Sequence, residues 1–94
     1  MRIGGKVPAS GEAYAANRAA HLAALEEVRA AAEAAAAGGG PKALERHLAR
    51  GKMAPRARVA ELLDPGAPFL EIGATAAHGM YDGAAPCAGV VAGI

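Results

Sequence analysis

The 94-residue sequence has few of the residues that build a hydrophobic core. It contains no Trp, one Phe and two Tyr. Fourteen of its alanines lie between residues 11 and 37, and each alanine adds little buried apolar area. A chain of this length forms at most one small domain, and small domains bury a smaller fraction of their surface than large ones. The composition therefore predicts marginal stability.

Other absences exclude whole classes of protein. With a single cysteine, Cys87, the chain cannot form an internal disulfide, which favours a reducing compartment and a cytoplasmic location. The first eleven residues lack the apolar run of a secretory signal, and no apolar segment is long enough to span a bilayer. Ser10 is the only serine, so no Ser-His-acid triad is predicted, and Cys87 has no neighbouring base in the sequence that would make it a nucleophile.

Two motif types are present only in part. His21, His47, His78 and Cys87 are metal-ligating residue types, but they lack the close pairs that build zinc sites, so no metal site is predicted. Glycines 38–40 precede a helix start, where backbone N–H groups attract anions. Their spacing matches neither the dinucleotide fingerprint nor the phosphate-loop motif, and we interpret them as a linker between two helices.

Start and stop signals divide the rest of the chain into short elements. We expect a flexible tail over residues 1–10 and a helix over residues 11–37, with Ser10 as its N-cap and Gly38 as its stop. Two further helices are predicted over residues 41–50 and 55–63, each opened by a proline. Residues 69–72 and 88–94 are predicted as short strands, separated by a segment rich in glycine and alanine.

The apolar positions predict how these elements pack. In the first helix the larger side chains recur at steps of three and four, which gives one narrow stripe. Its members are Tyr14, Arg18, Leu22, Leu25, Val28 and Ala32. The stripe favours an extended arm laid over another surface; the alternative is an alanine-rich, low-complexity linker. Five apolar side chains of the second and third helices are expected to meet: Leu44, Leu48, Val59, Leu62 and Leu63.

Positive charge is concentrated in residues 41–58. Six basic residues and one glutamate give this segment a formal charge of +5, whereas the whole chain carries +1. The basic residues are Lys42, Arg46, Arg50, Lys52, Arg56 and Arg58. Nucleic-acid binding is one interpretation, weakened by the near-neutral total and by the lack of aromatic residues among the basic ones. A helical docking segment without chemistry is another. A structural role is a third, in which Arg56 and Arg58 pair with Glu61, Asp64 or a carboxylate beyond the chain.

The ordered series of residues from Gly38 onward resembles the carboxyltransferase (beta) subunit of biotin-dependent acyl-CoA carboxylases. The likeness is weak from Tyr14 to Gly38 and dense after it. It rests on Gly38-Gly39-Gly40, Lys42, Arg46-His47, Arg50-Gly51-Lys52, Pro55-Arg56, Arg58-Val59, Leu62-Leu63-Asp64, Gly66 and Pro68-Phe69-Leu70-Glu71. Residues 76–82 and 88–94 look most like the methylcrotonoyl-CoA type. Two positions depart from the family pattern, because Ala57 replaces a usual glutamate and Cys87 a usual glycine.

The resemblance implies a fold class and an activity. The fold would be an α+β fragment: a helical arm over residues 11–37, two short helices, and then the first strands of a crotonase-like domain of ββα units, truncated, over residues 38–94. The full-length enzyme would transfer carboxylate from carboxybiotin to an acyl-CoA, 3-methylcrotonoyl-CoA in leucine degradation. Two strands alone are rarely stable in water, so we expect further strands after Ile94 and an inactive fragment.

The resemblance also implies partners and binding residues. Biotin would be carried covalently on a biotin carboxylase/biotin carrier (alpha) subunit, and the beta subunits would form a homo-oligomer without nucleic acid or membrane. The oxyanion-stabilising turns of the family lie downstream of Ile94, so no catalytic residue is assigned here. Lys52, Arg56 and Arg58 are the candidates for binding the CoA phosphates, because lysine and arginine bind phosphate by charge and hydrogen bonds.

Overall fold

The computed structural model describes residues 4–5 and 9–94. In chain order its elements are α1 (Glu12–Ala37), α2 (Pro41–Ala49), α3 (Pro55–Leu62), β1 (Glu71–Ile72), the 3-10 helix η1 (Met80–Gly83) and β2 (Ala92–Gly93). The three helices agree with the predicted ranges to within one residue at each end, whereas both strands are shorter than predicted. Most of the predicted tail, residues 1–10, lies outside the described residues.

Local sequence explains the long helix α1. Its run of alanine, leucine and glutamate contains neither glycine nor proline, and these residues have high helix propensity. Gly38 ends it with a φ of 64°, a conformation that other residues adopt only with strain, and its N–H donates to the carbonyl of Ala35 at 3.1 Å. The prediction that Ser10 caps the helix is wrong, because Gly11 occupies the N-cap and no side chain caps it.

The two strands form a short antiparallel ladder. Glu71 pairs with Gly93 and Ile72 with Ala92, and the backbones of Leu70 and Ile94 extend the ladder through N–H to carbonyl bonds of 2.7 and 3.1 Å. A Cβ atom added at Gly93 would lie 2.5 Å from the carbonyl oxygen of Leu70 and 2.6 Å from Cε2 of Phe69. Only glycine therefore allows the strand and the phenyl ring to approach this closely.

Little of the described chain is buried. Among residues 4–5 and 9–94 the buried hydrophobic residues are three alanines, Ala31, Ala35 and Ala77. The expectation that the apolar residues of α2 and α3 meet in a common core is wrong: Leu44 is 40% exposed, Leu48 51% and Leu62 83%. The first turn of α3 lies against α1 and β1 through Arg56, so Leu62 at the far end of this two-turn helix has no neighbour to cover it.

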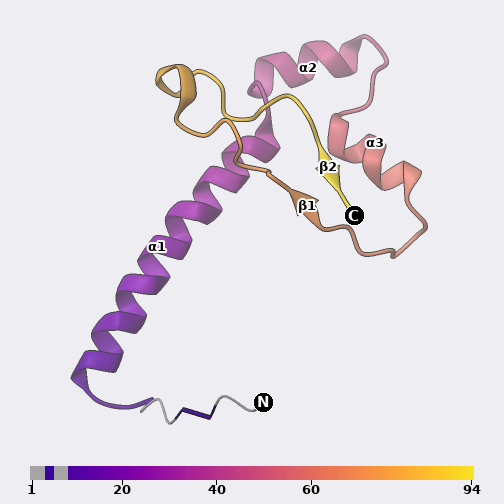
Figure 1. Ribbon diagram of the computed structural model, residues 1–94. Coiled ribbons are helices and arrows are strands. Elements are labelled where there is room, and N and C mark those ends of the chain that lie inside the picture. The colour runs from indigo at the N-terminus through magenta and orange to yellow at the C-terminus, as the bar shows by residue number, and fades with distance from the viewer. Residues whose placement is uncertain (1–3, 6–8) are drawn as a thin grey trace.

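The overall dimensions reflect this lack of a core. α1 extends away from the other elements and meets them only at its C-terminal end (Figure 1). The molecule measures 57 × 36 × 19 Å with a radius of gyration of 18.7 Å, against about 13 Å for a compact 100-residue domain. Its accessible surface is 8014 Å², whereas a compact monomer of 9.3 kDa exposes about 5,000 Å². Within the described ranges, no helix has both the length and the hydrophobicity to cross a membrane.

Candidate functional site

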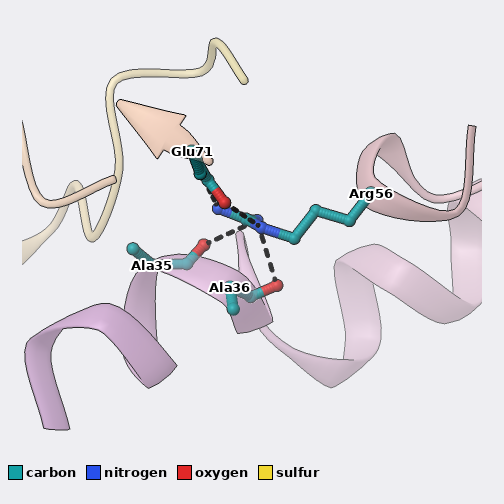
Figure 2. Close-up of polar contacts among 4 residues, drawn as sticks. All are labelled: Ala35, Ala36, Arg56 and Glu71. Carbon is teal, nitrogen blue, oxygen red and sulfur yellow. Dashed lines mark hydrogen bonds and ion pairs between the residues drawn. The ribbon is translucent and has the colours of Figure 1, made fainter. Parts of the chain in front are cut away.

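Arg56 lies where three elements of the chain meet. Pro55 occupies the first helical position of α3, where its fixed φ suits a helix start, and this places Arg56 in the first turn. From there its guanidinium reaches Glu71 of β1 and makes two bonds (Figure 2): Nε donates to Oε2 at 3.1 Å and Nη2 to Oε1 at 2.5 Å. Paired bonds of this kind between a planar guanidinium and a carboxylate fix orientation as well as distance.

The same guanidinium also reaches the end of α1. Nη1 of Arg56 lies 3.5 Å from the carbonyl oxygens of both Ala35 and Ala36, as Figure 2 shows. The last four carbonyls of a helix have no intrahelical partner, and the partial negative charge at that end attracts cations. These two bonds are long and individually weak, but they connect α1 to α3 and β1. Arg56 therefore contacts residues up to 21 positions away in the sequence.

A second polar contact shapes the turn before α3. Nε2 of His47 in α2 lies 2.9 Å from the carbonyl oxygen of Met53, so the tautomer with a proton on Nε2 donates this bond. The contact spans the turn of residues 50–54 that joins α2 to α3. His47 therefore has a structural partner that the sequence did not reveal.

Two hollows lie beside the Arg56 side chain. The larger, of about 600 Å³, is a groove lined by the end of α1, by α2, by residues 53–56 and Arg58, and by Cys87 and residues 89–91. The smaller, of about 320 Å³, is lined by α3, the turn of residues 63–67 and β1. Both are mainly apolar, and Arg56 lines both. Cys87 is half-buried in the wall of the larger groove.

The structure separates the three predicted phosphate-binding residues. Arg56 and Arg58 both line the larger groove, whereas Lys52 lies in the preceding turn and does not line it. Lys52 and Arg58 are exposed, and within the described residues neither has an ion pair. Arg56 is engaged with Glu71. Whether any of them binds CoA stays a prediction.

The ion-pair partner expected for Arg56 was not the right one. The sequence offered Glu61, Asp64 or a carboxylate beyond the chain, and the structure selects Glu71, fifteen residues away. The available signal was a single acidic residue inside the apolar strand of residues 69–72. The Glu71 side chain is only 23% exposed, and a carboxylate that is largely removed from water benefits from a cationic partner. In the part of the chain that the structure describes, no cluster of three His, Cys, Asp or Glu could hold a metal.

Comparison with curated proteins gives these residues a context. The chain is 56% identical over 61 residues, 65% of its length, to the biotin-dependent 3-methylcrotonyl-coenzyme A carboxylase beta1 subunit of Mycobacterium tuberculosis. It is 39% identical over 88 residues, 94% of its length, to the mitochondrial methylcrotonoyl-CoA carboxylase beta chain of Arabidopsis thaliana. A probable biotin-dependent acyl-coenzyme A carboxylase beta2 subunit from M. tuberculosis is 51% identical over 55 residues.

This chain is a relative of carboxylase beta subunits. The resemblance found in the sequence is thereby confirmed, and so is its leaning toward the methylcrotonoyl-CoA type. The chain spans 12% of the length of the first of these beta subunits and 15% of the second. No family model matches the chain, and no solved structure matches it.

Proposed function

We propose that this chain is part of a carboxyltransferase subunit that moves carboxylate from carboxybiotin to an acyl-CoA. The observation that carries the proposal is the 88-residue match to a methylcrotonoyl-CoA carboxylase beta chain, which covers 94% of the chain. On this proposal the substrate is 3-methylcrotonoyl-CoA, an intermediate of leucine degradation, and the strands β1 and β2 belong to the first units of a crotonase-like domain. Biotin is carried on the alpha subunit, and the beta subunits form a homo-oligomer.

The proposal gives a supporting role in catalysis to the junction around Arg56, which consists of Arg56, Glu71 and the carbonyl groups of Ala35 and Ala36. Transfer of carboxylate requires that an enolate and carboxybiotin be held in fixed positions, and donors must stabilise the oxyanion that forms. We assign no such donor to this chain. Its contribution is to fix the helical arm, α3 and the first strand relative to one another through Arg56 and Glu71.

We also propose that Lys52, Arg56 and Arg58 lie near the CoA phosphates of the full-length enzyme. The exposure of Lys52 and Arg58 supports a direct contact for these two. Arg56 would add positive charge while it remains fixed by Glu71. On this proposal, Arg58→Ala in the full-length enzyme raises the KM for acyl-CoA in a manner that depends on salt, without loss of thermal stability. A lower melting temperature at unchanged KM would assign Arg58 a structural role instead.

A chimera tests the proposed function directly. The 61 matching residues of the M. tuberculosis beta1 subunit are replaced by the corresponding residues of this chain, and carboxylation of 3-methylcrotonoyl-CoA is measured with the biotinylated alpha subunit. We expect the chimera to be active and this chain alone to give no carboxylated product. The control carries a segment of the same composition in scrambled order. A chimera that folds and assembles but is inactive would contradict the proposal, as would carboxylated product from this chain alone.

The alternatives from the sequence make different predictions. A nucleic-acid-binding segment would bind duplex DNA with an affinity that falls steeply as salt rises, because binding releases counterions. If the chain were a docking segment without chemistry, the chimera would be as inactive as the control with the scrambled segment. The location also stays a prediction: we propose a cytoplasmic enzyme, whereas the relatives from Arabidopsis and from Drosophila melanogaster are described as mitochondrial.

A further inference from the structure

The helix α1 is joined to the rest of the chain by a linker of three glycines, residues 38–40. Gly38 has a φ of 64° and a ψ of −137°, and Gly40 has a φ of 88° and a ψ of 171°. Only glycine adopts such positive φ values without strain. A Cβ atom built on either residue would meet nothing within 4 Å. The linker therefore has the backbone freedom and the open space of a hinge between two rigid elements.

Few contacts hold α1 to the elements that follow this linker. Nη1 of Arg56 lies 3.5 Å from the carbonyl oxygens of Ala35 and Ala36. Within residues 4–5 and 9–94, no other hydrogen bond or ion pair joins α1 to a later element. The residues of α1 that are buried are two alanines, Ala31 and Ala35. The orientation of α1 therefore depends on its C-terminal end alone, and chiefly on Arg56.

The bonds that Arg56 makes on its two sides differ in strength. Its bonds to the Glu71 carboxylate are 3.1 and 2.5 Å long, and both join opposite charges. Its bonds to α1 go to neutral carbonyls, and at 3.5 Å they are longer than an ordinary N–H to oxygen bond. The contact with α1 is therefore the one that breaks first, while the guanidinium stays bound to Glu71.

The larger groove lies at this hinge. Residues 35–39, from the end of α1 and the linker, line it together with residues 53–56 and 89–91 from later parts of the chain. Cys87 is half-buried in its wall. Because the lining comes from both sides of the linker, a rotation of α1 about the glycines changes the width of the groove and the exposure of the Cys87 thiol.

We propose that α1 is a hinged arm that gates the larger groove. The arm rotates about residues 38–40, and Arg56, anchored on Glu71, holds it in the closed position seen in Figure 1. In the open position α1 has left the guanidinium, and the groove with Cys87 is accessible to solvent. The fixed junction described above is the closed state of this device. The proposal rests on the linker, Arg56 and the groove, and it does not require the carboxyltransferase function.

The reactivity of Cys87 tests whether Arg56 holds the groove closed. Alkylation of the thiol by iodoacetamide is measured on the 94-residue chain, because local opening sets the rate for a half-buried group. Arg56→Ala should raise the rate roughly two- to tenfold, the factor that corresponds to the net contribution of one hydrogen bond. Arg58→Ala is the matched control, since it removes the same charge from the same groove but no bond to α1. Glu71→Gln loosens the strand but keeps the guanidinium, so it should have a smaller effect. A rate in Arg56→Ala no higher than in either control would overturn the proposal.

Distance measurements test whether the glycines are the hinge. In a Cys87→Ser background, spin labels are attached to cysteines at the exposed positions 18 in α1 and 61 in α3, and pulsed electron paramagnetic resonance gives the distribution of distances between them. Arg56→Ala should broaden the distribution. Gly39→Ala should narrow it, because alanine restricts the linker and leaves Arg56 and Glu71 in place. Gly39 has no left-handed φ, and the added Cβ meets only the methyl group of Ala43, at 3.3 Å. An unchanged distribution in Arg56→Ala, or one that Gly39→Ala leaves as broad as in the parent chain, would overturn the hinge.

Discussion

The helix α1 and the junction around Arg56 are held by interactions of different range. α1 depends on backbone bonds between residues four positions apart and has only Ala31 and Ala35 buried along its length. The junction depends on Arg56 and Glu71, fifteen positions apart, and on Arg56 and Ala35, twenty-one apart. Helices of alanine-rich sequence form from local interactions, whereas a two-stranded ladder is marginal without long-range support.

This difference predicts two independent responses to mutation. Changes in α1 should alter its helix content and leave the strands as they are, whereas changes at the junction should release the strands and leave most of α1 intact. Amide hydrogen exchange reports each region separately, because local opening occurs with its own free energy. The following variants are ordered from the largest expected effect to the smallest.

Gly93→Ala should separate β1 from β2. The added Cβ would lie 2.5 Å from the carbonyl oxygen of Leu70, and this backbone atom belongs to the ladder itself, so it cannot move without breaking the pairing. Overpacking of this kind typically costs about 1–3 kcal/mol. Amides of residues 70–72 and 92–94 should exchange at the rate of an unfolded chain. Gly5→Ala is the control, since nothing lies within 4 Å of a Cβ there; protection that survives in Gly93→Ala would show that the strands do not pair as described.

Arg56→Ala should loosen the junction as a whole. It removes both bonds to Glu71 and leaves that half-buried carboxylate without its partner. Hydrogen bonds to charged groups contribute about 1.5–3 kcal/mol, and the partial exposure of this pair, 35% and 23%, reduces the expected loss to about 1–2 kcal/mol. Exchange should accelerate at residues 70–72 while the circular dichroism of α1 changes little.

Arg56→Lys separates charge from geometry at the same position. Lysine keeps the positive charge but cannot make two parallel bonds to a carboxylate. We expect it to recover less than half of the protection lost in Arg56→Ala. Full recovery by lysine would mean that the positive charge alone holds the junction. The paired bonds of the guanidinium would then not be what distinguishes the junction from α1.

Sequence reasoning predicted the locally determined parts of the fold. Glycine, proline and the run of alanine and leucine place all three helices within one residue of their observed ends, because these signals act over a few residues. The prediction that five apolar side chains of α2 and α3 meet was wrong, because packing depends on how the two helices are oriented and nothing local specifies that orientation. These side chains are Leu44, Leu48, Val59, Leu62 and Leu63.

The candidate site shows the same limit. The sequence identified Arg56 as important by its charge and by a family resemblance, but not Glu71 as its partner or the carbonyls of Ala35 and Ala36 as further acceptors. Those contacts exist because a strand and a helix end come together in space. The only indication in the sequence was a single glutamate within an apolar strand. That position does not specify which of the six basic residues in the segment 41–58 it binds.

Ala23→Gly should reduce the helix content of α1 without affecting the junction. Position 23 is exposed in the middle of the helix, so the change alters propensity and not packing. Glycine is about 1 kcal/mol less favourable than alanine in a helix interior. The mean residue ellipticity at 222 nm should fall, and amides of residues 70–72 and 92–94 should keep their exchange rates. Faster exchange in the strands would show that α1 and the junction are coupled after all.

Glu26→Gln should have the smallest effect, although it also removes an ion pair. Glu26 and Arg29 lie 3.5 Å apart, and their side chains are 73% and 68% exposed, so water screens their attraction. Both side chains also lose conformational freedom when they pair. Pairs three positions apart on a helix contribute about 0.2–0.5 kcal/mol, several-fold less than we expect from the half-buried pair of Arg56 and Glu71. Ellipticity measured at low salt should fall slightly and converge with that of the wild-type chain at 1 M salt, where the Debye length is about 3 Å. A loss as large as that of Arg56→Ala would mean that exposure does not separate the two ion pairs, and the distinction between a local helix and a long-range junction would need a different physical basis.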